Sequence, residues 1–284
     1  MKYGVVSRSY PDMTVAEAAE YMSSRGFNCT ELCMTHPDFG GWVYNGLSAL
    51  DENGITKDLT KEKADVMRSR GIEVTAFGVF TNLLSPDDEY RNRCIESFIR
   101  CMDFAEYAGI KNLSTELGFR PERRGVTTDV YESDFTRLAE SFTTLGRAAG
   151  ERGLTICIEA CVIDVIPSAK RLRDFIIQIE RESGLTNIRV LMDMANFIAN
   201  SDEDDVFKYL APYIAYHHGK DRKFNDVAGR LIGDGEIDWV KFFVNYFRIT
   251  PDAPFILEYV TRETTDTANE RVEGYIIKAK EILG

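Results

Sequence analysis

Along the chain one pattern repeats: a short apolar run, a polar loop, and a segment whose apolar residues recur with the period of an amphipathic helix. The apolar runs predict eight strands, at residues 3–7, 28–34, 72–77, 112–116, 154–159, 188–193, 213–217 and 254–260. The periodic segments predict eight helices, at residues 14–25, 60–69, 87–108, 134–152, 168–182, 202–210, 238–246 and 268–283. Local signals support these boundaries, for example the capping box formed by Thr14 and Glu17.

This alternation of strands and helices predicts parallel βαβ crossovers. Eight units in 284 residues predict a single (β/α)8 barrel, the TIM barrel, with residues 1–284 forming one domain. An open doubly wound sheet is the alternative. It would normally carry a glycine-rich phosphate turn after the first strand, and no GxGxxG or Walker-type motif follows residues 3–7.

Composition narrows the classes of function. Lys and Arg number 34 against 46 Asp and Glu, a net charge of −12, which disfavours nucleic acid as a partner because phosphate binding needs many cationic contacts. The sequence has no apolar run long enough to span a membrane and no signal-peptide pattern, so we expect a cytoplasmic protein without a membrane partner. The six cysteines form no CxxC motif and are expected to be buried free thiols. Only three histidines are present, which excludes any site built from four imidazoles.

Barrels of this type carry their active sites at the C-terminal ends of the strands. Polar residues stand at that end of six otherwise apolar strands: Glu31, Glu116, Glu159, Asp193, His217 with His218, and Glu258. A buried carboxylate is costly unless it is paired, hydrogen-bonded or bound to a metal. Three carboxylates on the fifth, sixth and eighth strands and a histidine on the seventh suit a divalent ion such as Mn²⁺, Mg²⁺, Co²⁺ or Zn²⁺. Salt bridges with Arg or Lys at the barrel rim are the alternative.

Five short motifs carry a family resemblance: Ile158-Glu159, Met192-Asp193, His218-Gly219-Lys220-Asp221, the glycine-containing run 232–239, and Leu257-Glu258. With these motifs the chain resembles, over essentially its whole length, the xylose isomerase-like TIM barrel superfamily of sugar phosphate isomerases and epimerases. The resemblance implies that one divalent metal ion, with manganese expected first, is bound by four residues: Glu159, Asp193, His218 and Glu258. His218 matches the histidine of the family's His-x-Lys-Asp motif; a strand register shifted by one residue would give this role to His217.

The reaction that the resemblance implies is metal-dependent isomerisation or epimerisation of a sugar, keto-sugar or inosose. A proton is removed next to a carbonyl and a metal-stabilised enediolate forms. Glu159 and Glu258 are the implied catalytic residues, acting on opposite faces of the reacting carbon. Family members commonly form homo-oligomers, so the expected partners are a small carbohydrate and further copies of the chain.

One position departs from the family pattern. Many members have Asp-x-x-His after the sixth strand, where this chain has Asp193-Met194-Ala195-Asn196. Asn196 can hydrogen-bond a hydroxyl group but cannot carry a proton. A lyase of the same superfamily, such as an inosose dehydratase or a C-glycoside-cleaving eliminase, is therefore an alternative function. A non-catalytic sugar-binding barrel is a second alternative.

Five residues are predicted to contact the substrate: His36, Trp42, Glu116, Asn196 and Lys220. His36 and Trp42 belong to the long aromatic loop 36–45, for which a packed loop at the barrel rim is the alternative. Lys220 would balance charge at the substrate oxygens, or else be a solvated loop residue.

Three further positions complete the prediction. Asp221 would orient His218 or Lys220 as a partner behind the site. Arg8, just after the first strand, is placed to reach the barrel mouth. The basic cluster 120–124 is interpreted as solvated surface, so the sequence does not support a phosphorylated substrate.

Overall fold

The computed structural model describes residues 1–40, 47–51, 54–122 and 125–284. Its strands close a parallel barrel in sequence order, from β1 to β8, which confirms the predicted (β/α)8 architecture. The strands are β1 (Tyr3–Val5), β2 (Cys29–Cys33), β3 (Glu73–Gly78), β4 (Asn112–Glu116), β5 (Thr155–Glu159), β6 (Ile188–Asp193), β7 (Ile214–Gly219) and β8 (Phe255–Leu257).

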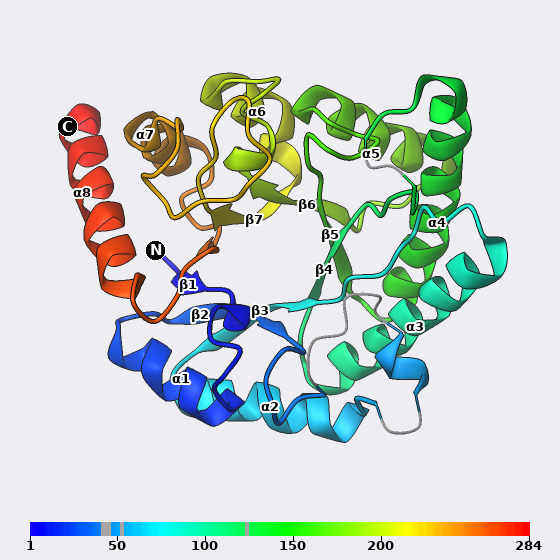
Figure 1. Cartoon of the computed structure of the whole chain (residues 1–284), viewed down its shortest axis with the longest axis horizontal. Coiled ribbons are helices and arrows are strands. Elements are labelled where there is room, and N and C mark those ends of the chain that lie inside the picture. The colour runs from blue at the N-terminus through cyan, green and yellow to red at the C-terminus, as the bar shows by residue number, and fades with distance from the viewer. Residues whose placement is uncertain (41–46, 52–53, 123–124) are drawn as a thin grey trace.

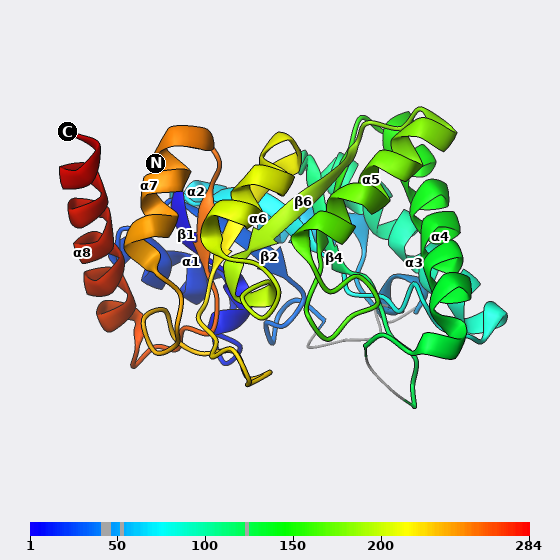
Figure 2. The same ribbon diagram turned by 90° about the horizontal axis from the view of Figure 1, so that it is seen from above.

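The helices of the eight units surround the barrel on its outside (Figure 1). They are α1 (Val15–Ser24), α2 (Lys57–Ser69), α3 (Asp88–Tyr107), α4 (Tyr131–Glu151), α5 (Ala169–Ser183), α6 (Glu203–Leu210), α7 (Trp239–Ile249) and α8 (Thr265–Leu283). Figure 2 shows that the loops following the strands gather at one end of the barrel. Within the described residues, no helix combines the length and the apolar character needed to cross a membrane.

Local capping explains where helices begin. The capping box of α1 is present, with the Thr14 hydroxyl accepting from the backbone of Glu17 and the Glu17 carboxylate accepting from the backbone of Thr14. Helix α2 begins at Lys57, three residues before its predicted start, because the Thr56 hydroxyl accepts a hydrogen bond from the Leu59 amide at 3.2 Å.

The apolar core has two layers. The larger one lies between the barrel and its helices and contains fully buried rings such as Phe142, Phe175 and Phe242. The smaller one fills the inside of the barrel with Val6, Cys29, Cys33, Ala76, Phe80, Cys157, Leu191, Tyr216 and Ile256. All six cysteines are free thiols, as predicted, and all but Cys161 are buried.

The strand register brings the polar strand ends to one level. Asp193 pairs with His218 between β6 and β7, and Glu116 pairs with Glu159 between β4 and β5. Strand β7 extends to Gly219, two residues beyond its predicted end, where a Cβ atom would lie 2.4 Å from the ring of Phe255. His218 is therefore held inside a strand rather than in a loop, so that its position is fixed by the barrel.

Candidate metal centre and active-site cavity

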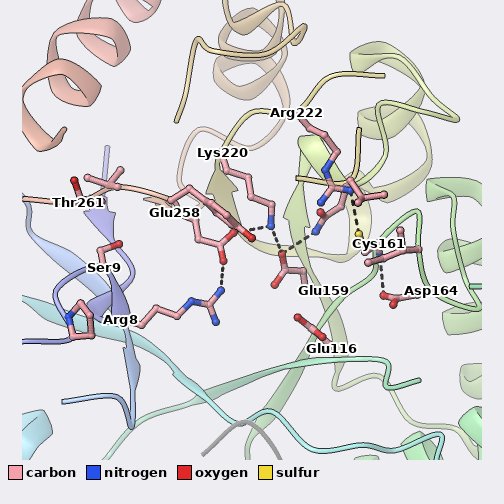
Figure 3. A pocket seen from close by; sticks show the side chains of 16 residues that line it. Arg8, Ser9, Glu116, Glu159, Cys161, Asp164, Lys220, Arg222, Glu258 and Thr261 are labelled. Atoms are coloured by element: carbon pink, nitrogen blue, oxygen red, sulfur yellow. Dashed lines mark hydrogen bonds and ion pairs between the residues drawn. The ribbon is translucent and has the colours of Figure 1, made fainter. Parts of the chain in front are cut away.

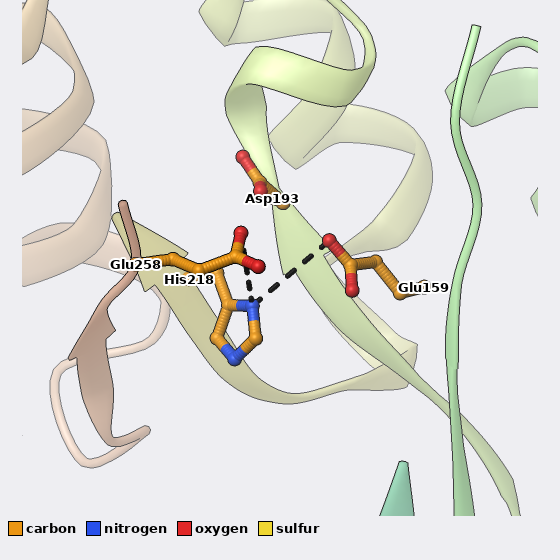
Figure 4. Close-up of side chains that lie close together, drawn as sticks. All are labelled: Glu159, Asp193, His218 and Glu258. Carbon is orange, nitrogen blue, oxygen red and sulfur yellow. Dashed lines mark ion pairs between the residues drawn. The ribbon is translucent and has the colours of Figure 1, made fainter. Parts of the chain in front are cut away.

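Four polar side chains meet at the C-terminal end of the barrel (Figure 4). Glu159 ends β5, Asp193 ends β6, His218 lies in β7 and Glu258 follows β8. One ligand atom from each of them lies within 4.8 Å of the others, and all four residues are buried. The structure thus brings together the four residues that the sequence predicts as metal ligands.

Local structure orients these side chains. The Oδ1 atom of Asp193 accepts a hydrogen bond from the Ala195 amide at 2.9 Å, at the start of the 3₁₀ turn Met194–Asn196. This bond leaves Oδ2 facing the cluster. The backbone amide of Glu258 donates to the Gly219 carbonyl at 3.1 Å, which continues the contact between β7 and β8 up to the site.

The two adjacent histidines point to opposite sides of β7, because successive side chains of a strand alternate. His217 faces the helices, where its Nε2 lies 2.9 Å from the Thr250 hydroxyl and its ring packs against Phe207 and Phe242. His218 faces the cluster. Its Nδ1 atom lies 3.9 Å from Glu159 Oε1 and 3.8 Å from Glu258 Oε2, and it has no hydrogen-bond partner among the described residues.

Two cations balance the carboxylates of the cluster. The Nζ atom of Lys220 lies 2.7 Å from Glu258 Oε2, 3.2 Å from Glu159 Oε1 and 2.8 Å from Asp193 Oδ2. Arg8 forms an ion pair with the other oxygen of Glu258 and stacks over the ring of Phe80 at 5.0 Å. Lys220 is buried, which excludes the alternative that it is a solvated loop residue.

Burial and neighbouring charge shift the protonation of the cluster in different directions. Burial raises the pKa of Asp193 to about 6, although Lys220 acts against this shift. Burial also opposes ionisation of Glu258, but Lys220 and Arg8 outweigh it and hold the pKa of Glu258 well below its usual range. For His218, burial is outweighed by the surrounding carboxylates, beginning with Glu31, which raise its pKa to about 8.

These observations fit a divalent cation. The donors are three carboxylates and one imidazole, a set that suits Mn²⁺, Mg²⁺, Co²⁺ or Zn²⁺. The Nδ1 atom of His218 is a buried polar atom without a hydrogen-bond partner in the described chain, and it faces the carboxylates. A cation among these groups would give this nitrogen a partner and would offset the repulsion between the carboxylates.

A cavity of about 590 Å³ opens beside the cluster (Figure 3). Glu159, Lys220 and Glu258 form part of its lining. The remaining lining residues include Arg8, Glu116, Cys161, Asp164, Asn196, Arg222, Val227 and Tyr259. Three predicted substrate contacts, Glu116, Asn196 and Lys220, therefore lie on the cavity wall.

Asn196 has one free acceptor at this wall. Its Nδ2 donates to Glu159 Oε1 at 2.8 Å, because a carboxylate can only accept. Its Oδ1 is buried and has no hydrogen-bond partner among the described residues. An amide oxygen can only accept, so any group that reaches it would have to donate a hydrogen bond to it.

Other predicted positions lie away from the cavity or outside the described chain. His36 is fully buried, donates from Nδ1 to the Met13 carbonyl at 2.9 Å, and does not line the cavity. Trp42 falls outside the residues that the structure describes. Arg120, in the basic cluster, forms an ion pair with the buried Asp134 at 2.5 Å instead of standing free in solvent.

Asp221 has partners other than the predicted ones, and this is a correction. Its Oδ2 accepts from Trp239 Nε1 at 2.8 Å and from the Gly233 amide at 2.9 Å. Its backbone pairs with that of Arg230 in an antiparallel bridge. The carboxylate therefore holds the loop between β7 and α7 together, because the loop folds back over Asp221 and its amides are the nearest donors.

Sequence reasoning assigns no role to Glu31 or Tyr259, which the structure places beside His218 and at the cavity. Glu31 is a polar residue at a strand end, and its partner His218 lies 187 residues further along the chain. Tyr259, at the mouth of the cavity, adopts φ = 56°, a conformation that is uncommon for a bulky residue. A polar residue in an apolar strand was the only available signal for Glu31.

The family comparison agrees with this geometry. A model of the family described as xylose isomerase-like TIM barrel matches residues 19–278. The chain belongs to this family. Its structural neighbours include a D-tagatose 3-epimerase-like protein, a 3-keto-D-glucoside 4-epimerase and a probable 3-DHS dehydratase, and at 13–15% identity they share the fold with this chain. A search of curated proteins by sequence gave no match.

Three solved structures illustrate the shared fold. A D-tagatose 3-epimerase-like protein has a TM-score of 0.80 at 15% identity, covering 100% of both chains. The 3-keto-D-glucoside 4-epimerase from E. coli has a TM-score of 0.73 at 13% identity, covering 96% of this chain and 99% of that one. An IolI protein with bound zinc has a TM-score of 0.71 at 16% identity, covering 99% and 96%.

Proposed function

We propose that this chain is a divalent-metal-dependent isomerase or epimerase of a sugar, keto-sugar or inosose that removes a proton next to a carbonyl. The observation that carries the proposal is the buried group of Glu159, Asp193, His218 and Glu258, whose ligand atoms lie within 4.8 Å of one another beside the cavity. The zinc-bound neighbour and the neighbours named as epimerases support such a role.

These four residues would hold the metal ion, and Mn²⁺ is the ion we expect first. When bound, a divalent cation supplies a Lewis acid that polarises a carbonyl and stabilises the negative charge that develops as the neighbouring proton leaves. The chain's own residues then have to orient the sugar, exclude water and move the proton.

Glu159 and Glu258 are the candidate proton carriers. They come from strands separated by two others, and both line the cavity, so they approach it from different sides (Figure 3). A base on one face and an acid on the other face of a carbon are what epimerisation requires. Arg8 and Lys220 keep Glu258 ionised. We therefore assign Glu258 as the group that accepts the proton when the hydrogen on the reacting carbon points toward it.

Lys220 and Asn196 are the candidate substrate contacts next to these carboxylates. The ammonium group of Lys220 lies between Glu159 and Glu258 and can donate to a substrate oxygen placed there. The Oδ1 of Asn196, which has no hydrogen-bond partner in the described chain, would accept from a hydroxyl group of the same molecule once the side chain turns toward the cavity. Together they would select a polyhydroxylated carbonyl compound over an apolar one.

Metal analysis tests the site. Protein loaded with Mn²⁺ should hold one ion per chain, and Glu159→Gln and Asp193→Asn should each lose most of it, because each removes one anionic donor. Glu203→Gln is the matched control, since Glu203 is a buried acid that accepts from the Asp238 amide away from the site. Unchanged metal content in both site variants, measured by mass spectrometry of the elements, would falsify the proposal.

Incubation in D₂O tests the reaction. The metal-loaded protein should exchange a carbon-bound hydrogen of a free ketose, an inosose or a 3-keto-glycoside for deuterium, without elimination. Glu258→Gln should lower the exchange rate by about 100-fold or more, since general acid–base catalysis contributes that much. NMR and mass spectrometry of the recovered sugar report both outcomes.

A lyase is the alternative that one observation favours. Asn196 occupies a position where it touches Glu159 but cannot transfer a proton. Loss of water or of an aglycone in the same incubation would support elimination instead of isomerisation. Absence of any exchange with all three substrate classes would support a sugar-binding barrel without catalysis.

A further inference from the structure

Glu31 is a buried carboxylate that no part of the proposed chemistry uses. It lies in β2, fully buried, next to the apolar side chains that fill the barrel. Its Oε2 accepts from the Tyr216 hydroxyl at 2.6 Å and contacts His218 Nε2 at 3.1 Å. The second oxygen is approached by the Cys33 thiol at 3.7 Å. A buried charge of this kind is costly, so its partners must account for it.

The barrel leaves room for this carboxylate. Gly78 ends β3 and pairs with Cys33 of β2. A Cβ atom at position 78 would lie 2.9 Å from Glu31 Oε1 and 2.9 Å from the Cys33 sulfur. Both distances are shorter than ordinary van der Waals contacts, so any other residue at position 78 would force the Glu31 or the Cys33 side chain to shift.

The contact with Glu31 decides which nitrogen of His218 faces the cluster. A carboxylate oxygen can only accept, so the hydrogen of the imidazole must be on Nε2. The lone pair of a neutral ring is then on Nδ1, the atom that faces Glu159 and Glu258 and has no partner within the described chain. The ring of Tyr216 packs edge-on against that of His218 at 5.7 Å, which limits rotation of the imidazole.

We propose that Glu31, held in place by Tyr216, is a positioning residue that fixes the orientation and tautomer of His218 so that Nδ1 ligates the metal. The inference rests on the proposed metal site and adds to it a carboxylate and a phenol that do not touch the ion. Partners of this kind behind a ligating histidine typically change metal affinity by about 10- to 100-fold.

The test compares metal affinity across three variants of the full-length protein. Affinities for Mn²⁺ and Zn²⁺ are measured by chelator competition. Glu31→Met removes the acceptor at similar size and should weaken binding about 10-fold or more. Glu31→Gln retains an amide oxygen that can accept from Nε2, so it should lose less. Tyr216→Phe removes a single hydroxyl and should weaken binding measurably but less than Glu31→Met does, since it only loosens Glu31.

Thr30→Val is the matched control in the same strand. The Thr30 hydroxyl is buried and donates to the Val5 carbonyl at 2.7 Å, away from the cluster. This variant should lose stability without losing metal affinity, which separates a general loosening of β2 from a displaced His218. The ¹⁵N shifts of the His218 imidazole, assigned with His218→Gln, should place the metal on Nδ1 and the hydrogen on Nε2.

Each outcome decides the inference. A folded Glu31→Met protein that binds both ions as tightly as the wild type overturns it, and so does metal on Nε2. If Glu31→Met does not fold, wild-type affinity in Tyr216→Phe overturns it. If the proposed metal site itself is wrong, the result is different. Glu159→Gln and Asp193→Asn would then keep their metal, whichever residue stands at position 31.

Discussion

His217 and His218 are neighbours in the chain, yet their surroundings give them different chemistry. His217 lies among aromatic rings on the opposite side of β7, and burial lowers its pKa to about 3. The carboxylates around His218 raise its pKa to about 8 in spite of similar burial. The side of the strand, and not the residue type, therefore determines which imidazole can serve the site.

His36 allows a test of how the burial of one titrating side chain changes the pH dependence of stability. Burial lowers the pKa of its imidazole, although the Met13 carbonyl and Asp38 act in the opposite direction. Between the folded pKa and the unfolded value of about 6.5, the unfolded chain binds a proton that the folded chain does not. Stability should therefore fall as the pH drops below about 6.5, by up to about 1.4 kcal/mol for each pH unit.

Urea unfolding at pH 7.5 and pH 5.5 measures this dependence. In His36→Gln the loss of stability between the two pH values should be smaller than in the wild type, since all other titrating groups are shared. The amide of glutamine can still donate to the Met13 carbonyl. An equal loss of stability in both proteins would mean that His36 takes up its proton in the folded state.

At the scale of elements, the loop between β7 and α7 carries Lys220 and Arg222 into the cavity. Asp221 holds this loop through Trp239 Nε1 and the Gly233 and Ile237 amides. Four donors, counting the Arg222 amide as well, converge on one buried carboxylate. The positions of the cavity residues thus depend on a side chain that does not line the cavity.

Asp221→Asn should destabilise the protein by about 1–3 kcal/mol, because the amide nitrogen cannot accept and leaves buried donors without partners. It should also make residues 222–236 more sensitive to limited proteolysis. Asp238→Asn is the matched control: Asp238 caps α7 by accepting from the Lys241 amide at 2.9 Å, and asparagine caps a helix equally well. Equal urea midpoints for both variants would contradict the role given to Asp221.

The barrel could be predicted because its signals are local. Strand and helix periodicity, the Thr14 capping box and the alternation of units are all visible within short windows. The four-residue cluster could be predicted because parallel strands deliver their ends to one rim. Contacts that depend on the folded chain could not be predicted. Asp221 accepts a hydrogen bond from Trp239 only after the loop has folded back. The contact of Glu31 with His218 forms only when the barrel closes.

At the scale of the whole molecule, the carboxylates of the cluster belong to a chain with an overall excess of negative charge. Three carboxylates face Lys220 and Arg8 there, in a chain whose net charge is already −12. A divalent cation would therefore stabilise the folded state by binding to it alone.

Metal removal should lower the thermal midpoint without unfolding the protein. At a free Mn²⁺ concentration 100 times the dissociation constant, binding adds about 2.7 kcal/mol of stability. This corresponds to roughly 5 °C for a chain of this size. Calorimetry with and without EDTA measures the shift, and Asp193→Asn should show almost none. A shift of the same size in that variant would place the stabilising ion elsewhere.

Lys220 has a consequence for the life of the protein in the cell. Small zinc domains cannot fold until their ion arrives, because their apolar cores are too small to be stable without the free energy of metal binding. Here the ammonium group of Lys220 already lies against three of the candidate ligands. A newly made chain can therefore complete its barrel first and acquire its ion afterwards, so that a pool of folded protein would wait for metal when supply is low.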